Sequence, residues 1–428
     1  MESILTALAP FAKVLFAFVL MLAGMRFKIG LGSSILIGGM VMGVLFGMAP
    51  LPILKVSAIA LTQEKFHFLI AIVGLILVLS DAMERSGQSK RLMEALSGFL
   101  TSPRLRLIFF PALIGLLPMP GGAVFSAPMV KTVSEEMRIR NSDRAVINYW
   151  FRHIWELVWP LYPGIILTLA LADIQIIDLI SYTWPGMPVM LLTGWFFYLR
   201  PGVLNADDLS IPNLPVGRSK LAALREGLPL LTAIVGAVGL ETGIASFAPT
   251  IPFELGVVTA LFLAVVCVMV QNTQLGLPFL KDVLMKKSLW SMIFVIVSIF
   301  VFKDIMQGAG VVEEMAQAAG GEAALFASAA FLPFLVGLVA GINVAFVGAT
   351  FPLLLGVLNS LGMQDQTIPY LVLATFAGFT GVMISPIHIC FILTCEYFKC
   401  DLMRTWRKVV APCLVFFASG VALFMVYK

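Results

Sequence analysis

Three ionisable residues stand close together in the apolar stretch Asn148-Tyr-Trp-Phe-Arg-His-Ile-Trp-Glu156. Arg152 and Glu156 are four residues apart, and His153 and Glu156 are three apart, so a helix would place each pair on one face. Carboxyl and imidazole groups take up and release protons, and ionisable groups inside a bilayer are costly enough to be functional candidates. We expect Glu156 or His153 to carry a proton, with Arg152 beside them. A structural pair with Arg152 reaching toward the membrane surface is the alternative.

Further polar side chains follow prolines in apolar segments. His388 lies two residues after Pro386, and Tyr162 lies two residues after Pro160. Proline removes a backbone donor and interrupts a helix, which leaves nearby groups available to a ligand. We predict ligand contacts for His388, Tyr162 and Ser385, against the alternative of ordinary packing.

Two glycine-containing segments, Pro118-Met-Pro-Gly-Gly122 and Ala340-Gly-Ile-Asn343, interrupt long apolar stretches. Glycine lets backbone approach a ligand closely, and helix N-termini favour anions. A simple tight turn is the alternative. The binding residues predicted at and after these segments are Pro120, Gly121, Gly122, Ser126, Asn343 and Thr350.

The composition restricts the class of protein that can position these residues. The chain has 428 residues, of which 60% are apolar and 12% are charged, and its net charge is +4. So few charges could not cover a soluble protein of this size, and the continuous apolar runs differ from the alternation of a barrel. We therefore expect an all-α polytopic membrane protein without a nucleic-acid partner. The five cysteines form no C-x-x-C pair, so we expect neither disulfides nor a metal site.

A spanning helix needs about 20 apolar residues. Full-length spans are predicted at 4–25, 30–49, 66–82, 177–199, 227–247, 253–271, 289–306 and 405–427.

Two more segments, 144–173 and 367–398, are long enough to cross but are interrupted at Trp159-Pro-Leu-Tyr-Pro-Gly164 and Gly378-Phe-Thr-Gly-Val-Met-Ile-Ser-Pro386. These broken helices bring the expected number of transmembrane helices to about ten.

Two further stretches, 105–137 and 322–358, contain the glycine segments at their centres. We predict that each is a re-entrant hairpin, with arms of about a dozen residues and a tip at membrane depth.

The two halves of the chain resemble each other. Val78–Gly87 aligns with Val301–Gly310, so that Asp81 matches Asp304, and Pro160 matches Pro386. Each half has five crossings, an odd number, so the copies must be inverted in the membrane. The first repeat is predicted at 1–199, with three spans in 1–101, hairpin 105–137, broken helix 144–173 and span 177–199. A cytoplasmic linker follows at 200–224. The second repeat is predicted at 225–428, with three spans in 225–320, hairpin 322–358, broken helix 367–398 and span 405–427.

With both termini outside, most of the 28 lysine and arginine residues fall on the cytoplasmic side, as the positive-inside rule requires. We expect a multi-pass protein of a bacterial cytoplasmic (inner) membrane.

Paired hairpins, each followed by a broken helix, resemble the ion-transporter superfamily of gluconate, citrate and C4-dicarboxylate carriers and some sodium/proton antiporters. Leu117–Met129 and Asn148–Glu156 further resemble an uncharacterised bacterial membrane family within that superfamily. The resemblance implies an elevator-type homodimer, in which hairpins and broken helices move against a scaffold formed by the three leading spans of each repeat. The Ser-Asn-Thr triplets of sodium-coupled dicarboxylate carriers are absent, and the nearest positions read Pro120-Gly-Gly122 and Ile342-Asn-Val344.

Together these features predict a secondary active transporter of a small organic anion, a carboxylate or sugar acid, driven by a proton or sodium gradient without a resident cofactor. A cation/proton antiporter is the alternative, because an intramembrane Glu156 serves that role too. An intramembrane enzyme is a less favoured interpretation, because the chain has no H-E-x-x-H motif. No catalytic residues are therefore assigned. The chain also lacks a G-x-x-x-x-G-K-[ST] loop, which argues against a nucleotide-driven pump.

Overall fold

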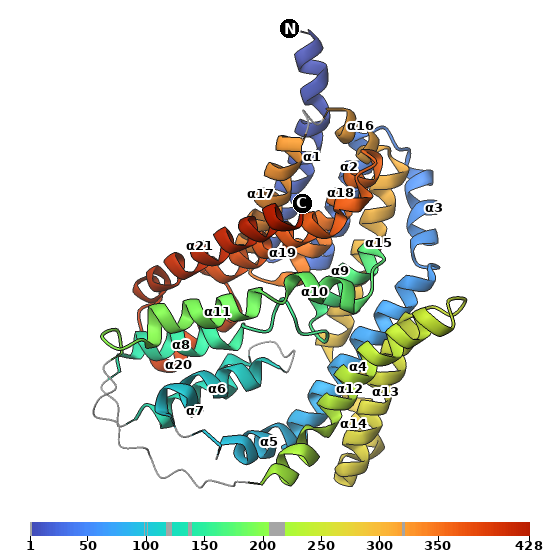
Figure 1. Cartoon of the computed structure of the whole chain (residues 1–428). Coiled ribbons are helices and arrows are strands. Elements are labelled where there is room, and N and C mark those ends of the chain that lie inside the picture. Colours follow the sequence, from blue (N-terminus) through green and yellow to red (C-terminus); the bar gives the residue numbers. More distant parts are fainter. Residues whose placement is uncertain are drawn as a thin grey trace.

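The structure, a computed structural model, describes residues 2–97, 99–100, 102–116, 122–135, 139–204, 219–318 and 322–428. Every regular element in these ranges is a helix, so the all-α prediction is confirmed (Figure 1). The first half contains α1 (Glu2–Arg26), α2 (Leu31–Leu45), α3 (Pro50–Ala60), α4 (Glu64–Arg85), α5 (Gln88–Ser97), α6 (Pro103–Gly115), α7 (Ala123–Val133), α8 (Asn141–Arg152), α9 (Pro163–Ala172), α10 (Ile176–Thr183) and α11 (Gly186–Gly194), then a π-helical turn at Trp195–Leu199. The second half contains α12 (Lys220–Phe247), α13 (Glu254–Gln271), α14 (Gly276–Leu284), α15 (Lys287–Gly308), α16 (Val311–Ala318), α17 (Glu322–Ala340), α18 (Asn343–Ser360), α19 (Thr367–Ile384), α20 (Ile389–Phe398) and α21 (Leu402–Tyr427), with short 3-10 turns at Thr273–Leu275 and Gln364–Gln366.

Eight helical stretches of the described chain are long and apolar enough to cross a membrane, which makes this a multi-pass membrane protein. They are Ala9–Arg26, Glu64–Arg85, Lys220–Phe247, Glu254–Gln271, Lys287–Gly308, Asn343–Ser360, Gln364–Phe398 and Leu402–Tyr427. Six of the predicted full-length spans coincide with α1, α4, α12, α13, α15 and α21.

Two predicted full-length spans are interrupted. The span expected at 30–49 ends as a helix at Leu45, because Gly47 has a φ of +83° and α3 begins at Pro50. Its 15 residues reach about 22 Å, short of the roughly 30 Å apolar core of a bilayer. The span expected at 177–199 is divided into α10 and α11 near Pro185, and it meets α9 at a bend of 117°.

The two stretches predicted as re-entrant hairpins are helix pairs of different length. α6 and α7 have 13 and 11 residues, as expected for short arms, and the tip at 117–121 lies outside the described residues. α17 and α18 have 19 and 18 residues, so the expectation of a dozen residues in each arm is wrong for the second pair. Both helices continue through an internal proline, Pro333 in α17 and Pro352 in α18.

Both broken helices are interrupted at segments that overlap the predicted motifs, but the bounds of the interruptions differ. α8 ends at Arg152 and α9 begins at Pro163, so the first interruption is longer than Trp159–Gly164. α19 stays helical to Ile384, so the second interruption is 385–388 only. The linker is also shorter than expected, because α12 begins at Lys220.

The helices are arranged in two groups (Figure 1). α4, α12, α13 and α14 pack together on one side, and α6, α7, α8, α20 and α21 pack together on the other. α9 lies between the groups and contacts α4 and α18. Two buried apolar clusters follow this division, and the first interruption lies where they meet, with Leu157 in one cluster and Leu161 in the other.

Candidate functional site

The candidate site lies where three helices begin. α9, α18 and α20 begin after Tyr162, Ile342 and His388, and none of these cap residues satisfies the first backbone N–H groups with its side chain. The beginnings of the helices lie close together. A Cβ placed on Gly164 would lie 3.1 Å from the Cβ of Asn343, and one placed on Gly341 would lie 3.2 Å from the backbone of His388.

Asn343 joins the second helix pair to the first interruption. Its Nδ2 donates a hydrogen bond of 2.5 Å to Oε2 of Glu156. The Tyr162 hydroxyl donates a hydrogen bond of 2.5 Å to the carbonyl of Gly115 and also lies beside the Glu156 carboxylate. The helical pairing expected for Arg152 and Glu156 is wrong in its geometry, because α8 ends at Arg152 and Glu156 lies in the irregular segment.

A small cavity adjoins Glu156. Its lining includes Glu156, Asn343, Phe346 and Thr375. Within the described part of the chain, the buried Oδ1 of Asn343 and Oγ1 of Thr375 have no hydrogen-bond partner. The residues that line the cavity therefore include one carboxylate side chain and two side chains with an unsatisfied oxygen atom.

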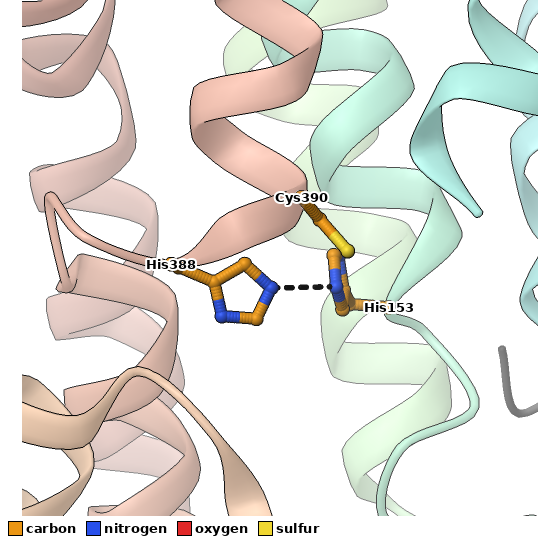
Figure 2. A group of neighbouring side chains, drawn as sticks. All are labelled: His153, His388 and Cys390. Carbon is orange, nitrogen blue, oxygen red and sulfur yellow. Dashed lines mark hydrogen bonds between the residues drawn. The ribbon is translucent and has the colours of Figure 1, made fainter. Parts of the chain in front are cut away.

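His153 and His388 face each other across the two interruptions (Figure 2). Their Nε2 atoms are 3.2 Å apart, although the residues are separated by 235 positions. Nδ1 of His153 lies 2.6 Å from the backbone carbonyl of Tyr149. The thiol of Cys390 completes a buried group in which the nearest ligand atoms of all three side chains lie within 4.8 Å of one another.

The surroundings hold these side chains in place. The Tyr149 ring packs edge-on against His153 and His388, with centroid distances of 4.9 and 5.4 Å, and its hydroxyl donates to the carbonyl of Met383. Arg152 is buried, donates to the carbonyl of Ile114 at 3.3 Å and lies near the Cys390 sulfur. Ser385 donates to the carbonyl of Leu338 at 2.7 Å, which joins the second interruption to α17.

The structure thus brings seven of the predicted residues together: Arg152, His153, Glu156, Tyr162, Asn343, Ser385 and His388. Ser126 belongs to an adjoining network, in which it donates to Asn148 at 2.6 Å and Asn148 donates to Thr394 at 3.2 Å. Gly122 is buried immediately before α7.

Two other groups of predicted residues fall elsewhere. Thr350 is not in the site, because it faces an apolar cavity with Phe11 and Pro333 and donates to the carbonyl of Phe346 on its own helix. Pro120 and Gly121 lie outside the described residues.

Sequence reasoning missed four residues of the site and its surroundings: Asn148, Tyr149, Thr375 and Cys390. Cys390 was not a candidate because the five cysteines form no C-x-x-C pair. The sequence contains one signal for Cys390, its position two residues after His388. A histidine and a cysteine so close together beside a helix interruption can bind the same metal ion.

Comparison with known proteins bears on the family alone. None of the curated proteins compared with the chain matches it. A family described as "Protein of unknown function (DUF401)" matches residues 8–427, which is nearly the whole chain. The interruptions, the buried polar site and every helix except the first turns of α1 lie within the matched region, and the chain belongs to this family.

Proposed function

We propose that the protein is a secondary active transporter that moves a small organic anion, a carboxylate or sugar acid, by alternating access. The observation that carries the proposal is the meeting of three helix N-termini, those of α9, α18 and α20, without side-chain caps around a buried polar site. Unpaired N–H groups and the positive ends of helix dipoles bind carboxylates and phosphates. The same arrangement of interrupted helices is typical of carriers.

Glu156 is the proposed site of coupling to a proton. Its carboxylate accepts a hydrogen bond from the side-chain amide of Asn343, the first residue of α18. The carboxylate of Glu156 therefore occupies a place where an anion would bind. Protonation of Glu156 removes this internal negative charge. The carboxylate of the substrate can then bind at the helix N-termini without repulsion from Glu156. Substrate and proton then cross together, and loss of the proton on the other side expels the substrate.

The proposal includes two inverted repeats, and reciprocal contacts support it. Asp81 near the end of α4 is ion-paired with Lys286, which precedes α15. Asp304 near the end of α15 accepts a hydrogen bond of 2.5 Å from Gln63, which precedes α4. Matching residues of α4 and α15 therefore make matching contacts in opposite directions, as two inverted copies would.

The close helix contacts are repeated as well. A Cβ placed on Gly115 would lie 2.2 Å from the carbonyl oxygen of Arg152, and one placed on Gly337 would lie 2.3 Å from that of Gly378. Each glycine thus brings the first helix of a pair against the broken helix of the same half.

By resemblance to the ion-transporter superfamily, the proposed motion is that of an elevator. α6–α9 and α17–α20 would move against a scaffold of α1–α4 and α12–α15, in a homodimer embedded in a bacterial inner membrane with both termini outside. The proposal assigns a solute and the lipid bilayer as partners and no enzymatic reaction.

One observation favours a cation/proton antiporter as the second candidate. Glu156, Asn343 and Thr375 border one small cavity, and the last two each present an oxygen atom without a partner among the described residues. Carboxylate, amide and hydroxyl oxygens are ligands for hard cations. In that case Glu156 would exchange a proton for the cation, and sodium would be the first ion to test.

A thermal-shift screen of the detergent-purified protein tests the two candidates together. Carboxylates, sugar acids and phosphates are added with and without sodium at two pH values, because a ligand that binds the folded state raises the apparent melting temperature. We expect one anion class to give a shift that is larger at the lower pH. The shift should be lost in Asn343→Asp, which adds a second carboxylate beside Glu156 at the start of α18, and kept in Thr350→Val, whose side chain is outside the site.

A response to sodium without any response to anions would reject the anion carrier and favour the antiporter. An anion shift that survives in Asn343→Asp would place the binding site elsewhere.

A further inference from the structure

His153, His388 and Cys390 have the composition of a metal-binding group. They come from the end of α8, the interruption before α20 and the first turn of α20 (Figure 2). Each side chain is more than nine-tenths buried. Imidazole nitrogen and thiolate sulfur are the preferred ligands of Zn²⁺ and similar borderline ions, whereas Mg²⁺ and Ca²⁺ require oxygen.

The separation of the two imidazoles fits a shared ion. Two nitrogens bound to one tetrahedral Zn²⁺ at about 2.0–2.1 Å lie about 3.3 Å apart, and the Nε2 atoms of His153 and His388 are 3.2 Å apart. A nitrogen and a sulfur on the same ion lie about 3.6 Å apart, and the ligand atoms of the three side chains all fall within 4.8 Å of one another. The three ligand atoms are therefore close enough for one ion to contact them all.

The tautomer of His153 fits the same role. A backbone carbonyl only accepts hydrogen bonds, so the Tyr149 carbonyl at 2.6 Å requires the proton on Nδ1 of His153. Neutral His153 then has an unprotonated Nε2, and this is the atom that faces His388 and Cys390. An imidazole oriented by a backbone carbonyl through its other nitrogen is the usual arrangement of a metal ligand.

We infer that His153, His388 and Cys390 bind one Zn²⁺-class ion, with a fourth position open to water or an anion. The thiol proton of Cys390 leaves to solvent as the sulfur binds the metal. The ion would join the end of α8 to the start of α20, so it would link the two halves of the chain at the site. The proposed coupling group of the carrier, Glu156, and its partner Asn343 are not ligands of this ion, so metal binding can be tested separately from transport.

Metal titration of the purified full-length protein tests the inference. The protein is prepared in detergent without a histidine tag, treated with a chelator, and titrated with Zn²⁺ for elemental analysis and with Co²⁺ for absorption spectroscopy. We expect one ion per chain, the visible bands of tetrahedral Co²⁺, and an ultraviolet thiolate-to-cobalt charge-transfer band. Zn²⁺ should also raise the apparent melting temperature.

Matched cysteine variants identify the ligand. Cys390→Ser should lose the charge-transfer band and bind at least about tenfold more weakly. Cys395→Ser alters a second buried cysteine of α20 that is outside the group, and it should behave as wild type. His153→Gln is a second variant that removes a metal ligand. Size-exclusion profiles and melting temperatures without metal establish that each variant is folded.

The inference is overturned if the folded wild-type protein binds no ion at micromolar Zn²⁺ or Co²⁺. It is equally overturned if the charge-transfer band survives in Cys390→Ser or disappears to the same extent in Cys395→Ser. Since no transport is measured, these outcomes leave the carrier proposal to be decided by its own experiment.

Discussion

At the scale of single residues, the site depends on contacts between groups that are distant in the sequence. Glu156 is held by Asn343, which is 187 positions away, and His153 faces His388 from the other half of the chain. Residue type and local pattern indicated these side chains as candidates. Their partners were not indicated, because a hydrogen bond between two halves of a chain depends on how the helices pack.

Substitution of Glu156 tests its proposed coupling role. Glu156→Gln keeps the size of the side chain but cannot ionise, so it imitates the protonated carboxyl group at every pH. We expect uptake into proteoliposomes to lose its pH dependence, whereas wild-type uptake rises as the external pH falls. Anion binding in thermal-shift assays should then be equal at both pH values. Unchanged pH dependence in a folded Glu156→Gln protein would remove this residue from the coupling role.

At the scale of helices, two glycines in α19 allow close packing and do not interrupt the helix, although the sequence motif predicted an interruption. Gly378 and Gly381 suggested an unwound helix, yet α19 is helical through both. A Cβ on Gly378 would lie 2.4 Å from the ring of Phe346, and one on Gly381 would lie 2.1 Å from the carbonyl oxygen of Phe334. These glycines therefore allow α17 and α18 to pack closely against α19.

A pair of glycine variants tests this packing role. Gly381→Ala forces a methyl group against backbone, so we expect it to destabilise the protein by about 1–3 kcal/mol. Gly239→Ala in α12 is the matched control, because a Cβ there would meet no atom within 4 Å. Alanine favours helix over glycine by roughly 0.5–1 kcal/mol, so the control should keep or raise the melting temperature. Equal melting temperatures for the two variants would contradict the close-packing role.

The junction of α4 and α15 allows a second test at this scale. Asp81 forms ion pairs with Arg85, at 3.0 Å, and with Lys286, while Asp304 is ion-paired with Lys303 at 3.3 Å and accepts a hydrogen bond from Gln63. Asp81→Asn and Asp304→Asn should each lower the free energy of unfolding by about 1–2 kcal/mol, since hydrogen bonds to charged groups are lost. Similar losses of thermal stability are expected because the contacts are reciprocal. A loss in one variant alone would argue against equivalent roles in the two halves.

At the scale of the whole molecule, the chain is a multi-pass membrane protein. The many apolar side chains exposed on its long helices, such as those of α12, are expected for a surface in contact with lipid. The orientation of the halves in the membrane follows from the distribution of lysine and arginine and stays a prediction.

Cysteine labelling measures that orientation. Lys220 and Asp365 are exposed, and the prediction places Lys220 in the cytoplasm and Asp365 outside. A membrane-impermeant maleimide applied to spheroplasts should label Asp365→Cys directly and Lys220→Cys only after permeabilisation. The wild-type protein controls for its own cysteines, which are buried or half-buried. The reverse labelling pattern would invert the topology.

The sequence by itself determined the class of protein, most of the long helices and the neighbourhood of both interruptions. These properties depend on the length of apolar runs and on proline, which act locally. The tertiary structure decided the extent of α17 and α18, the helical state of Gly378 and Gly381, and the exclusion of Thr350 from the site. It also decided that Cys390 stands with two histidines. Packing between helices sets these features, and no local pattern encodes which side chains it brings together.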